Sequence, residues 1–328
     1  MKVIVDAMGG DNAPNEIIKG SIDALNEENI QLLLVGNEEL IVKELEKYNY
    51  EKDKLEILNA SDIITNDDDP AIAIRRKKDS SMVVGLKALK EGKGDAFISA
   101  GNTGAILAGG LFIVKRIPGV ERAALTSVYP TVKGNVLLVD AGANVDTKAE
   151  FLRQFGIMGS IYMENIREIT NPKVGLVNIG IEEAKGNAVT KEAYTLLKET
   201  DINFIGNIEG RDIPAGIADV IVADGFVGNV VLKLTEGMAS SIFSILKEIF
   251  MTNTKTKLAA LLIKPQLEEL KAFMDYREYG SAPLLGVTKP VFKAHGSSDA
   301  YAFKNGIKHL INFHGKDITG IIEERFKI

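Results

Sequence analysis

The chain has 328 residues, of which 45% are hydrophobic and 26% charged, the ordinary balance of a folded globular protein. A net charge of −6 and the absence of tryptophan argue against a nucleic-acid-binding role, which relies on basic surfaces and aromatic stacking platforms. The chain has no cysteine, which excludes disulfides, thiolate metal sites and a covalent intermediate on cysteine.

Short apolar runs alternate with helical patterns along the chain. The predicted strands are Lys2–Val5, Gln31–Val35, Leu55–Leu58, Ala96–Ser99, Val136–Val139, Lys173–Val177, Asn203–Ile205 and Val220–Val222. The predicted helices include Pro14–Asn26, Glu38–Lys47, Ser80–Lys90 and Thr190–Lys198. Strands separated by helices indicate parallel pairing with crossover helices, an α/β layered fold. We expect one continuous domain over 1–328, with a possible division into two lobes around a cleft.

Several predicted strands end in loops rich in glycine, asparagine and aspartate. These loops are Asp6–Pro14, Ser99–Ala105, Asp140–Asn144, Gly206–Asp212 and Ala223–Asn229. Turn formation explains one such loop, but not the same composition after several strands. Ligands of parallel sheets bind beyond the carboxyl ends of the strands, so we expect a polar ligand cleft there.

The loop Ser99–Ala105 has the sequence Ser-Ala-Gly-Asn-Thr-Gly-Ala and precedes an apolar segment that starts at Ile106. Gly101 and Gly104 permit backbone angles and close approaches that a side chain blocks. Small polar residues at a helix start leave N–H groups that attract anions. The loop therefore predicts either a phosphate-binding turn or a helix cap without a ligand.

A run of four cations, Arg75 to Lys78, follows the acidic run Asp67–Asp69. Such a run is commonly a solvated surface. Here it precedes a predicted helix start at Ser80, so Arg75 or Lys78 could also reach a bound phosphate, and the other cations could attract an acidic partner protein. The sequence leaves both interpretations open.

Carboxylates occur in the same loops, at Asp6, Asp11, Asp140, Glu209 and Asp224. Pairs of carboxylates bind Mg²⁺, but beside glycine and asparagine they more commonly fix turns. No histidine or cysteine spacing for a transition metal is present, and we predict no metal site.

The chain has three histidines, two of which, His309 and His314, fall in a helical region where a structural or exposed position is expected. His295 lies in the glycine–serine loop Ala294–Ala300. It is the one histidine we consider as an acid or an oxyanion donor, with a structural role as the alternative.

The segment 235–276 breaks the alternation. Ile242–Phe250 has the apolar spacing of one helix face, and a second apolar face follows in Leu258–Ile263. We expect a protruding helical hairpin, whose first face suits core or dimer packing. The second face is flanked by lysines and suits shallow contact with an anionic membrane. The predicted membrane contacts are Leu258, Leu261 and Leu262.

The motifs of several common enzyme classes are missing. Neither Gly-x-Ser-x-Gly nor Gly-x-x-x-x-Gly-Lys-Ser/Thr occurs, and Asp6–Pro14 does not match Gly-x-Gly-x-x-Gly, so serine hydrolases, P-loop enzymes and typical Rossmann dehydrogenases have little support. The apolar start Lys2–Val5 is too short for a signal peptide, and no stretch reaches the roughly 20 residues of a membrane span. We expect a cytoplasmic protein with peripheral membrane contact.

Motifs along nearly the whole chain resemble, in the right order, those of the bacterial acyl-ACP:phosphate acyltransferases of phospholipid synthesis. The segments are Asp6–Pro14, Arg75–Met82, Ser99–Ala105, Asp140–Asn144, Asn207–Arg211, Ala223–Asn229 and Gly280–Gly286. The resemblance implies transfer of a long acyl chain from acyl carrier protein to inorganic phosphate, without a cofactor. The acyl phosphate then feeds a membrane-bound glycerol-3-phosphate acyltransferase. The implied fold is a three-layer α/β/α sandwich related to isocitrate and isopropylmalate dehydrogenases and phosphotransacetylases, as a homodimer.

For this activity we expect Ser99, Asn102, Thr103 and His295 to act in catalysis. The expected phosphate-binding residues are Gly9, Gly10, Asp11, Arg75, Lys78, Gly101, Gly104, Asn144 and Asn229. The alternatives are a phosphotransacetylase that uses short acyl-CoA, a dehydrogenase that requires NAD and Mg²⁺, and a membrane adaptor without catalysis.

Overall fold

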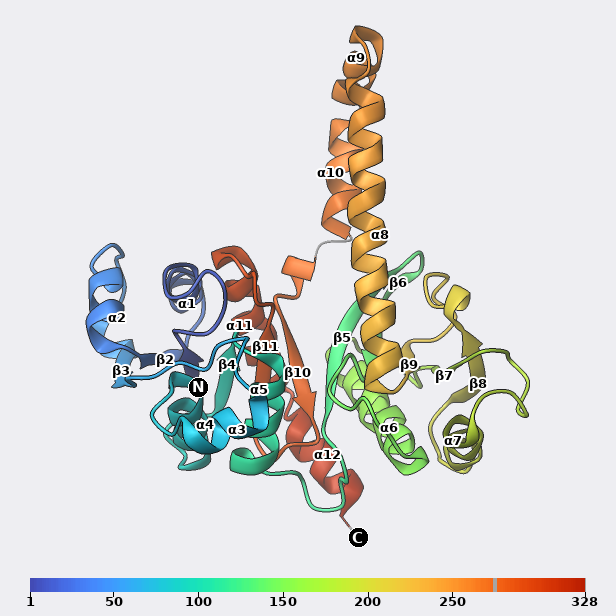
Figure 1. The fold of residues 1–328 in the computed structure, drawn as a ribbon, viewed down its shortest axis with the longest axis horizontal. Helices are drawn as coiled ribbons and strands as arrows, with labels where there is room; N and C mark the ends of the chain where they lie inside the picture. The colour runs from blue at the N-terminus through green and yellow to red at the C-terminus, as the bar shows by residue number, and fades with distance from the viewer. Residues whose placement is uncertain (274–275, 328) are drawn as a thin grey trace.

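The computed structural model describes residues 1–273 and 276–327 and contains an 11-stranded sheet (Figure 1). The strand order is β3-β2-β1-β4-β11-β10-β5-β6-β9-β7-β8. The strands are β1 Lys2–Asp6, β2 Gln31–Gly36, β3 Leu55–Asn59, β4 Ala96–Ser99, β5 Ala124–Thr131, β6 Gly134–Val139, β7 Val174–Asn178, β8 Phe204–Glu209, β9 Val220–Val222, β10 Ser281–Leu285 and β11 Val291–Ala294. Every strand predicted from the sequence is present, with ends shifted by a few residues.

The sheet has two parallel parts joined by antiparallel pairs. Strands β3, β2, β1, β4 and β11 run parallel, as do β6, β9, β7 and β8. Strands β10 and β5 pair antiparallel with each other and with their outer neighbours. Strands β5, β10 and β11 were not predicted from the sequence. The segment Gly206–Asp212, expected as a loop, is instead the end of β8 followed by a 3₁₀ turn.

Helices cover both faces of the sheet because successive strand residues point to opposite sides. Val3 and Val5 of β1 enter one apolar core, and Ile4 between them enters another. The helices are α1 Asn15–Glu27, α2 Glu38–Leu45, α3 Pro70–Arg76, α4 Ser81–Lys90, α5 Thr103–Gly109, α6 Ala149–Ile166, α7 Ala188–Lys198, α8 Gly225–Met251, α9 Thr254–Leu262, α10 Lys264–Phe273, α11 Ala300–Gly315 and α12 Ile318–Phe326. The result is a three-layer arrangement.

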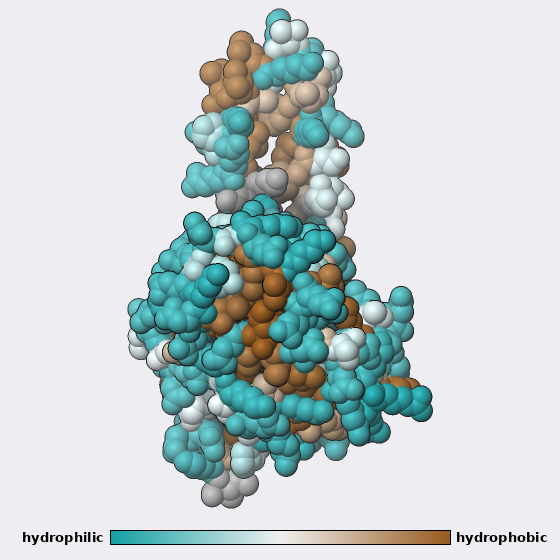
Figure 2. Space-filling model, turned by 90° about the vertical axis from the view of Figure 1, so that its left-hand side faces the viewer, coloured by the Kyte–Doolittle hydropathy of each residue, from teal (hydrophilic) through white to brown (hydrophobic). Residues whose placement is uncertain are grey.

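Helices α8, α9 and α10 project from the layers as a hairpin (Figure 1). Helix α8 begins at Gly225, directly after β9, so its first turns pack on the sheet and its later turns stand clear of it. In the space-filling view, apolar atoms gather at the outer end of the hairpin (Figure 2). Leu258, Leu261 and Leu262 of α9 are 59%, 67% and 73% exposed.

Candidate functional site

The loop after β4 is held by its own polar side chains. Ser99 is fully buried; its hydroxyl donates to Asp6 Oδ2 over 2.7 Å and accepts from the Gly101 N–H over 3.0 Å. Asn102 caps α5, because its Oδ1 accepts from the Ala105 N–H while its Nδ2 donates to the Thr65 carbonyl. Ser99 and Asn102 therefore shape the turn rather than face a ligand with free side chains.

Two further loops interlock with this turn. A Cβ atom on Gly9 would lie 2.8 Å from both the Gly101 nitrogen and Ser99 Oγ, so a side chain has no room there. Gly10 has φ +108 and packs against Ala100, and the Asp11 N–H donates to the Gly296 carbonyl over 2.8 Å. The loops after β1, β4 and β11 thus form one unit.

The loop after β6 joins the start of α8 in the same way. Asp140 is fully buried, and its carboxylate accepts from the backbone of residues 142–144 and from Asn144 Nδ2. Gly228 has to be glycine, since its Cβ would lie 1.9 Å from the Asp140 carbonyl oxygen. Asn144, buried and bonded to Ala123 and Asp140, supports this loop from behind.

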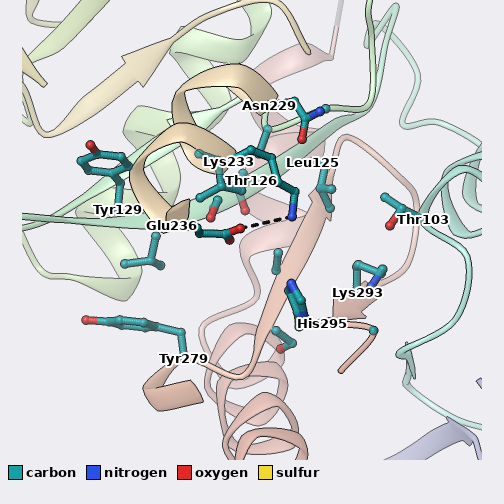
Figure 3. Close-up of a pocket in the computed structure, with 18 of the residues that line it drawn as sticks. Thr103, Leu125, Thr126, Tyr129, Asn229, Lys233, Glu236, Tyr279, Lys293 and His295 are labelled. Carbon is teal, nitrogen blue, oxygen red and sulfur yellow. Dashed lines mark hydrogen bonds and ion pairs between the residues drawn. The ribbon is translucent and has the colours of Figure 1, made fainter. Parts of the chain in front are cut away.

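A pocket of about 510 Å³ opens between these two sets of loops (Figure 3). It exists because β5 and β10 pair only at Leu125–Leu284 and Ala124–Leu285. Beyond these pairs, residues of both strands line the cavity, and α8 forms a further wall. The pocket includes Gly101, Thr103, Gly142, Asn229, Lys233, Glu236, Lys293, His295 and Gly296.

Two lysines bring positive charge into the pocket. Lys293 projects from the central strand β11, and burial together with the charge of Lys233 lowers its pKa to about 8. Lys233 of α8 forms an ion pair with Glu236 over 3.2 Å (Figure 3). No carboxylate of the described residues is within ion-pair distance of Lys293, whose ammonium donates to the Ala294 carbonyl. This arrangement suits an anionic ligand.

His295 lies beside Lys293 in the pocket (Figure 3). Burial and the neighbouring Lys293 charge lower the pKa of His295, so the imidazole is neutral at neutral pH. The Ser297 N–H points at Nδ1 over 3.3 Å and the Ser297 hydroxyl lies 2.9 Å from the same atom, and both contacts are satisfied when Nδ1 accepts. The proton of the neutral ring is then on Nε2, where it can serve as a hydrogen-bond donor.

The structure brings some of the expected residues together and separates others. Gly101, Thr103, Asn229 and His295 line the pocket. Ser99, Asn102, Gly9, Gly10, Gly104 and Asn144 lie behind it, and Gly104 packs against Pro70. Asp11 lies against Gly296, where its negative charge partly offsets the lowering of the pKa values of Lys293 and His295. Arg75 and Lys78 are outside the lining; the Arg75 guanidinium stacks over Phe112.

Lys233 and Lys293 were missed in the sequence. Each stands alone among apolar neighbours, the pattern of a solvated position on an amphipathic element.

Among residues 1–273 and 276–327, no set of three or more histidines and carboxylates is arranged for a metal ion. Within the same ranges, no helix has the length and apolarity to cross a bilayer.

Comparisons with known proteins agree with this architecture. A family model described as "Fatty acid synthesis protein" matches residues 1–320. The phosphate acyltransferase of Alkaliphilus oremlandii is 58% identical over 324 residues, 99% of this chain and 97% of that protein. The phosphate acyltransferase of Halothermothrix orenii is 52% identical and covers 99% of this chain and 98% of its own length.

Solved structures share the fold at low sequence identity. A phosphotransacetylase from Streptococcus pyogenes has a TM-score of 0.63 at 16% identity, over 96% of this chain and 94% of that one. A 4-hydroxythreonine-4-phosphate dehydrogenase from Klebsiella pneumoniae has a TM-score of 0.53 at 11% identity, over 95% and 98% of the two chains. The predicted α/β/α sandwich with a mostly parallel sheet is confirmed.

Proposed function

Because this chain belongs to the phosphate acyltransferase family and is an acyltransferase, we propose that it moves a long-chain fatty acyl group from acyl carrier protein to inorganic phosphate. The acyl phosphate product then feeds phosphatidic acid synthesis through a membrane-bound glycerol-3-phosphate acyltransferase. The observation that carries the proposal is a pair of lysines facing one pocket at the junction of the glycine loops.

The reaction needs positioning more than activation. Phosphate is already an anionic nucleophile, and one of its oxygens attacks the thioester carbonyl carbon to form a tetrahedral oxyanion. The carbon–sulfur bond then breaks, and the leaving sulfur takes the proton that hydrogen phosphate gives up on forming the acyl phosphate, which yields the free carrier thiol. Holding the reactants in place supplies about 7–11 kcal/mol in favourable cases. Since the chain has no cysteine, acyl transfer through a cysteine is excluded and direct attack is favoured.

Positive charge for the phosphate comes in this proposal from Lys233 and Lys293. Thr103 and Asn229 line the same pocket and supply hydrogen bonds. The backbone near Gly101 contributes less than its sequence indicates, because the Gly101 N–H is already donated to Ser99. The Nε2 proton of His295 stabilises the oxyanion, an interaction worth roughly 3–4 kcal/mol when well placed.

Other expected residues take different roles. The Asp11 carboxylate would repel phosphate, so we assign it to balancing the charge of Lys293. Arg75 and Lys78 are exposed and outside the pocket, and they suit an acidic carrier protein better than the phosphate. Ser99, Asn102, Gly9, Gly10, Gly104 and Asn144 position the loops.

The proposed homodimer and the membrane contact use the hairpin. Helix α8 exposes an apolar stripe on the side away from the pocket, which we take as a dimer face; it comprises Val230, Leu234, Met238, Ile242, Ile245 and Ile249. Sedimentation tests this, because Leu234→Glu should give monomers, and unchanged sedimentation would remove the stripe from the interface. The exposed leucines at the tip of α9 then provide the proposed membrane contact.

One assay tests the proposed activity. Purified protein is mixed with palmitoyl-acyl carrier protein, with and without inorganic phosphate, and the product is identified by mass. We expect palmitoyl phosphate and free carrier only when phosphate is present. Acetyl-CoA serves as the second substrate, because acetyl phosphate formed at a higher rate than palmitoyl phosphate would make the chain a phosphotransacetylase.

A further inference from the structure

The pocket extends well beyond the lysines, along β5 and α8. On α8 its lining runs from Asn229 to Ala239, which the helical rise of roughly 1.5 Å per residue separates by about 15 Å. On the opposite wall it runs along β5 from Leu125 to Pro130. The cavity is therefore elongated, with the glycine loops at one end and Ala239 towards the other.

The end remote from the lysines is lined mainly by carbon. Figure 3 shows Tyr129 and Tyr279 far from Thr103 and Lys293. Their hydroxyls are already engaged: Tyr129 bonds Thr235 Oγ1 over 2.8 Å, and Tyr279 accepts from Asn135 Nδ2. Aliphatic side chains on the two walls are Val128 and Pro130 of β5 and Leu232 and Ala239 of α8.

The charges along the α8 wall do not interrupt this apolar path. Glu236 is held in an ion pair with Lys233, and the side chains of Lys233 and Glu236 are 58% and 36% exposed. The Glu236 carboxylate therefore does not stand as an unpaired charge beside the apolar wall. A ligand that spans the whole cavity meets a cationic end and an apolar end in turn.

We propose that the extension between β5 and α8 holds the hydrocarbon tail of the acyl group, with the reacting carbonyl at the Lys293 end. The assignment rests on the proposed function and adds the binding site for the tail. An extended fatty chain matches the cavity in shape, and its methylenes gain from leaving water. A short acyl group would leave the remote end unfilled.

Ala239 determines in this arrangement how long a chain fits. Its small side chain lines the remote end, and a larger one there occupies the space of the last methylenes. When an apolar pocket cannot accommodate one methylene of a substrate, the ratio of kcat/KM between that substrate and a shorter one changes by about tenfold or more. Ala239 is thus a specificity-determining residue that leaves the phosphate end untouched.

The test compares kcat/KM for octanoyl-, dodecanoyl- and palmitoyl-carrier protein in the wild type, Ala239→Leu and Ala239→Phe. Palmitoyl transfer should fall relative to octanoyl transfer by about tenfold or more in Ala239→Phe, with a smaller change in Ala239→Leu. Ser244→Phe is the matched control, because Ser244 is exposed on α8 outside both the pocket lining and the apolar stripe, and it should keep the wild-type profile.

The outcomes separate the two proposals. Wild-type protein that makes no acyl phosphate from any substrate would overturn the proposed function. A wild type that is active, together with Ala239 variants of unchanged chain-length profile, would overturn the tail site alone. The milder Ala239→Leu keeps the comparison possible if phenylalanine prevents folding, which circular dichroism would reveal.

Discussion

At the scale of single residues, Lys293 is the most informative. It lies on β11, between β4 and β10 in the sheet, where its neighbours Phe292 and Ala294 are fully buried. Lysine is rarely buried without a partner of opposite charge. Asp11 balances the charge of Lys293 without forming an ion pair with it, and a bound phosphate would supply the direct partner.

Replacing Lys293 tests this role. Lys293→Gln should lower kcat/KM for phosphate by roughly 100-fold, the scale of losing one charge-stabilising group in an active site. Steady-state kinetics with phosphate varied at saturating acyl donor measure the loss. Lys289→Gln, on the loop before β11 and outside the pocket lining, is the control and should behave as the wild type. Equal phosphate kinetics in both variants would remove Lys293 from the site.

The pKa of Lys293 predicts a pH dependence. Burial lowers this pKa to about 8, so the ammonium loses its proton, and its attraction for phosphate, as the pH rises through that value. Activity should therefore decline above about pH 8. Arginine keeps its charge at higher pH, so in Lys293→Arg any remaining activity should lose this alkaline limb. An identical limb in both proteins would mean that another group titrates.

At the scale of elements, the strands with uninterrupted apolar runs were predictable, and the central ones were not. Strand β5 alternates buried and half-buried residues and contains Pro130, which is typical of an edge or a loop. Strand β10 contains Pro283, and β11 carries Lys293. The two prolines and Lys293 made these strands hard to predict from the sequence. The same strands border the pocket, because the sheet opens between β5 and β10.

Helix α3 offers a basic surface beside the pocket. It starts where Pro70 packs on Gly104, and its exposed Arg75 stacks on the half-exposed ring of Phe112. Neither Arg75 nor Arg76 pairs with a carboxylate among the described residues. Such a surface of cations and an aromatic ring suits an acidic carrier protein.

Charge reversal on α3 tests whether this helix binds the carrier protein rather than the acyl group. Arg75→Glu/Arg76→Glu should raise KM for palmitoyl-carrier protein severalfold and leave KM for palmitoyl-CoA unchanged, since only the carrier contacts α3. Added salt should raise the wild-type KM for the carrier substrate in the same way. Lys185→Glu/Lys191→Glu, exposed near α7, controls for net charge. Parallel changes for both donors would rule out carrier docking here.

The tip of α9 is the second element with a testable surface. Leu258→Glu/Leu262→Glu should abolish sedimentation with anionic vesicles, because charged side chains oppose insertion at the lipid boundary. Activity on dispersed substrate should persist, since the tip is remote from the pocket. Leu40→Glu/Val42→Glu alters two exposed apolar residues of α2 and should still sediment. Retained vesicle binding by the α9 variant would exclude the tip.

At the scale of the whole molecule, the site exists only because the chain brings distant loops together. The sequence showed polar loops after several strands, but which of them meet depends on the strand order. The loops after β4, β6 and β11 reach the pocket and the loop after β1 packs behind them, whereas β8 is an edge strand and its end lies elsewhere. The positions of Lys233 and Lys293 follow from the same topology, so no local pattern marked them.

The central claim is that inorganic phosphate binds between the glycine loops and the two lysines. A crystal structure of the protein with phosphate tests it most directly. We expect density for the ion within hydrogen-bond distance of Lys293 and Thr103, with the surrounding loops unchanged. Phosphate bound only outside this pocket, or a pocket that stays empty at saturating phosphate, would contradict the account.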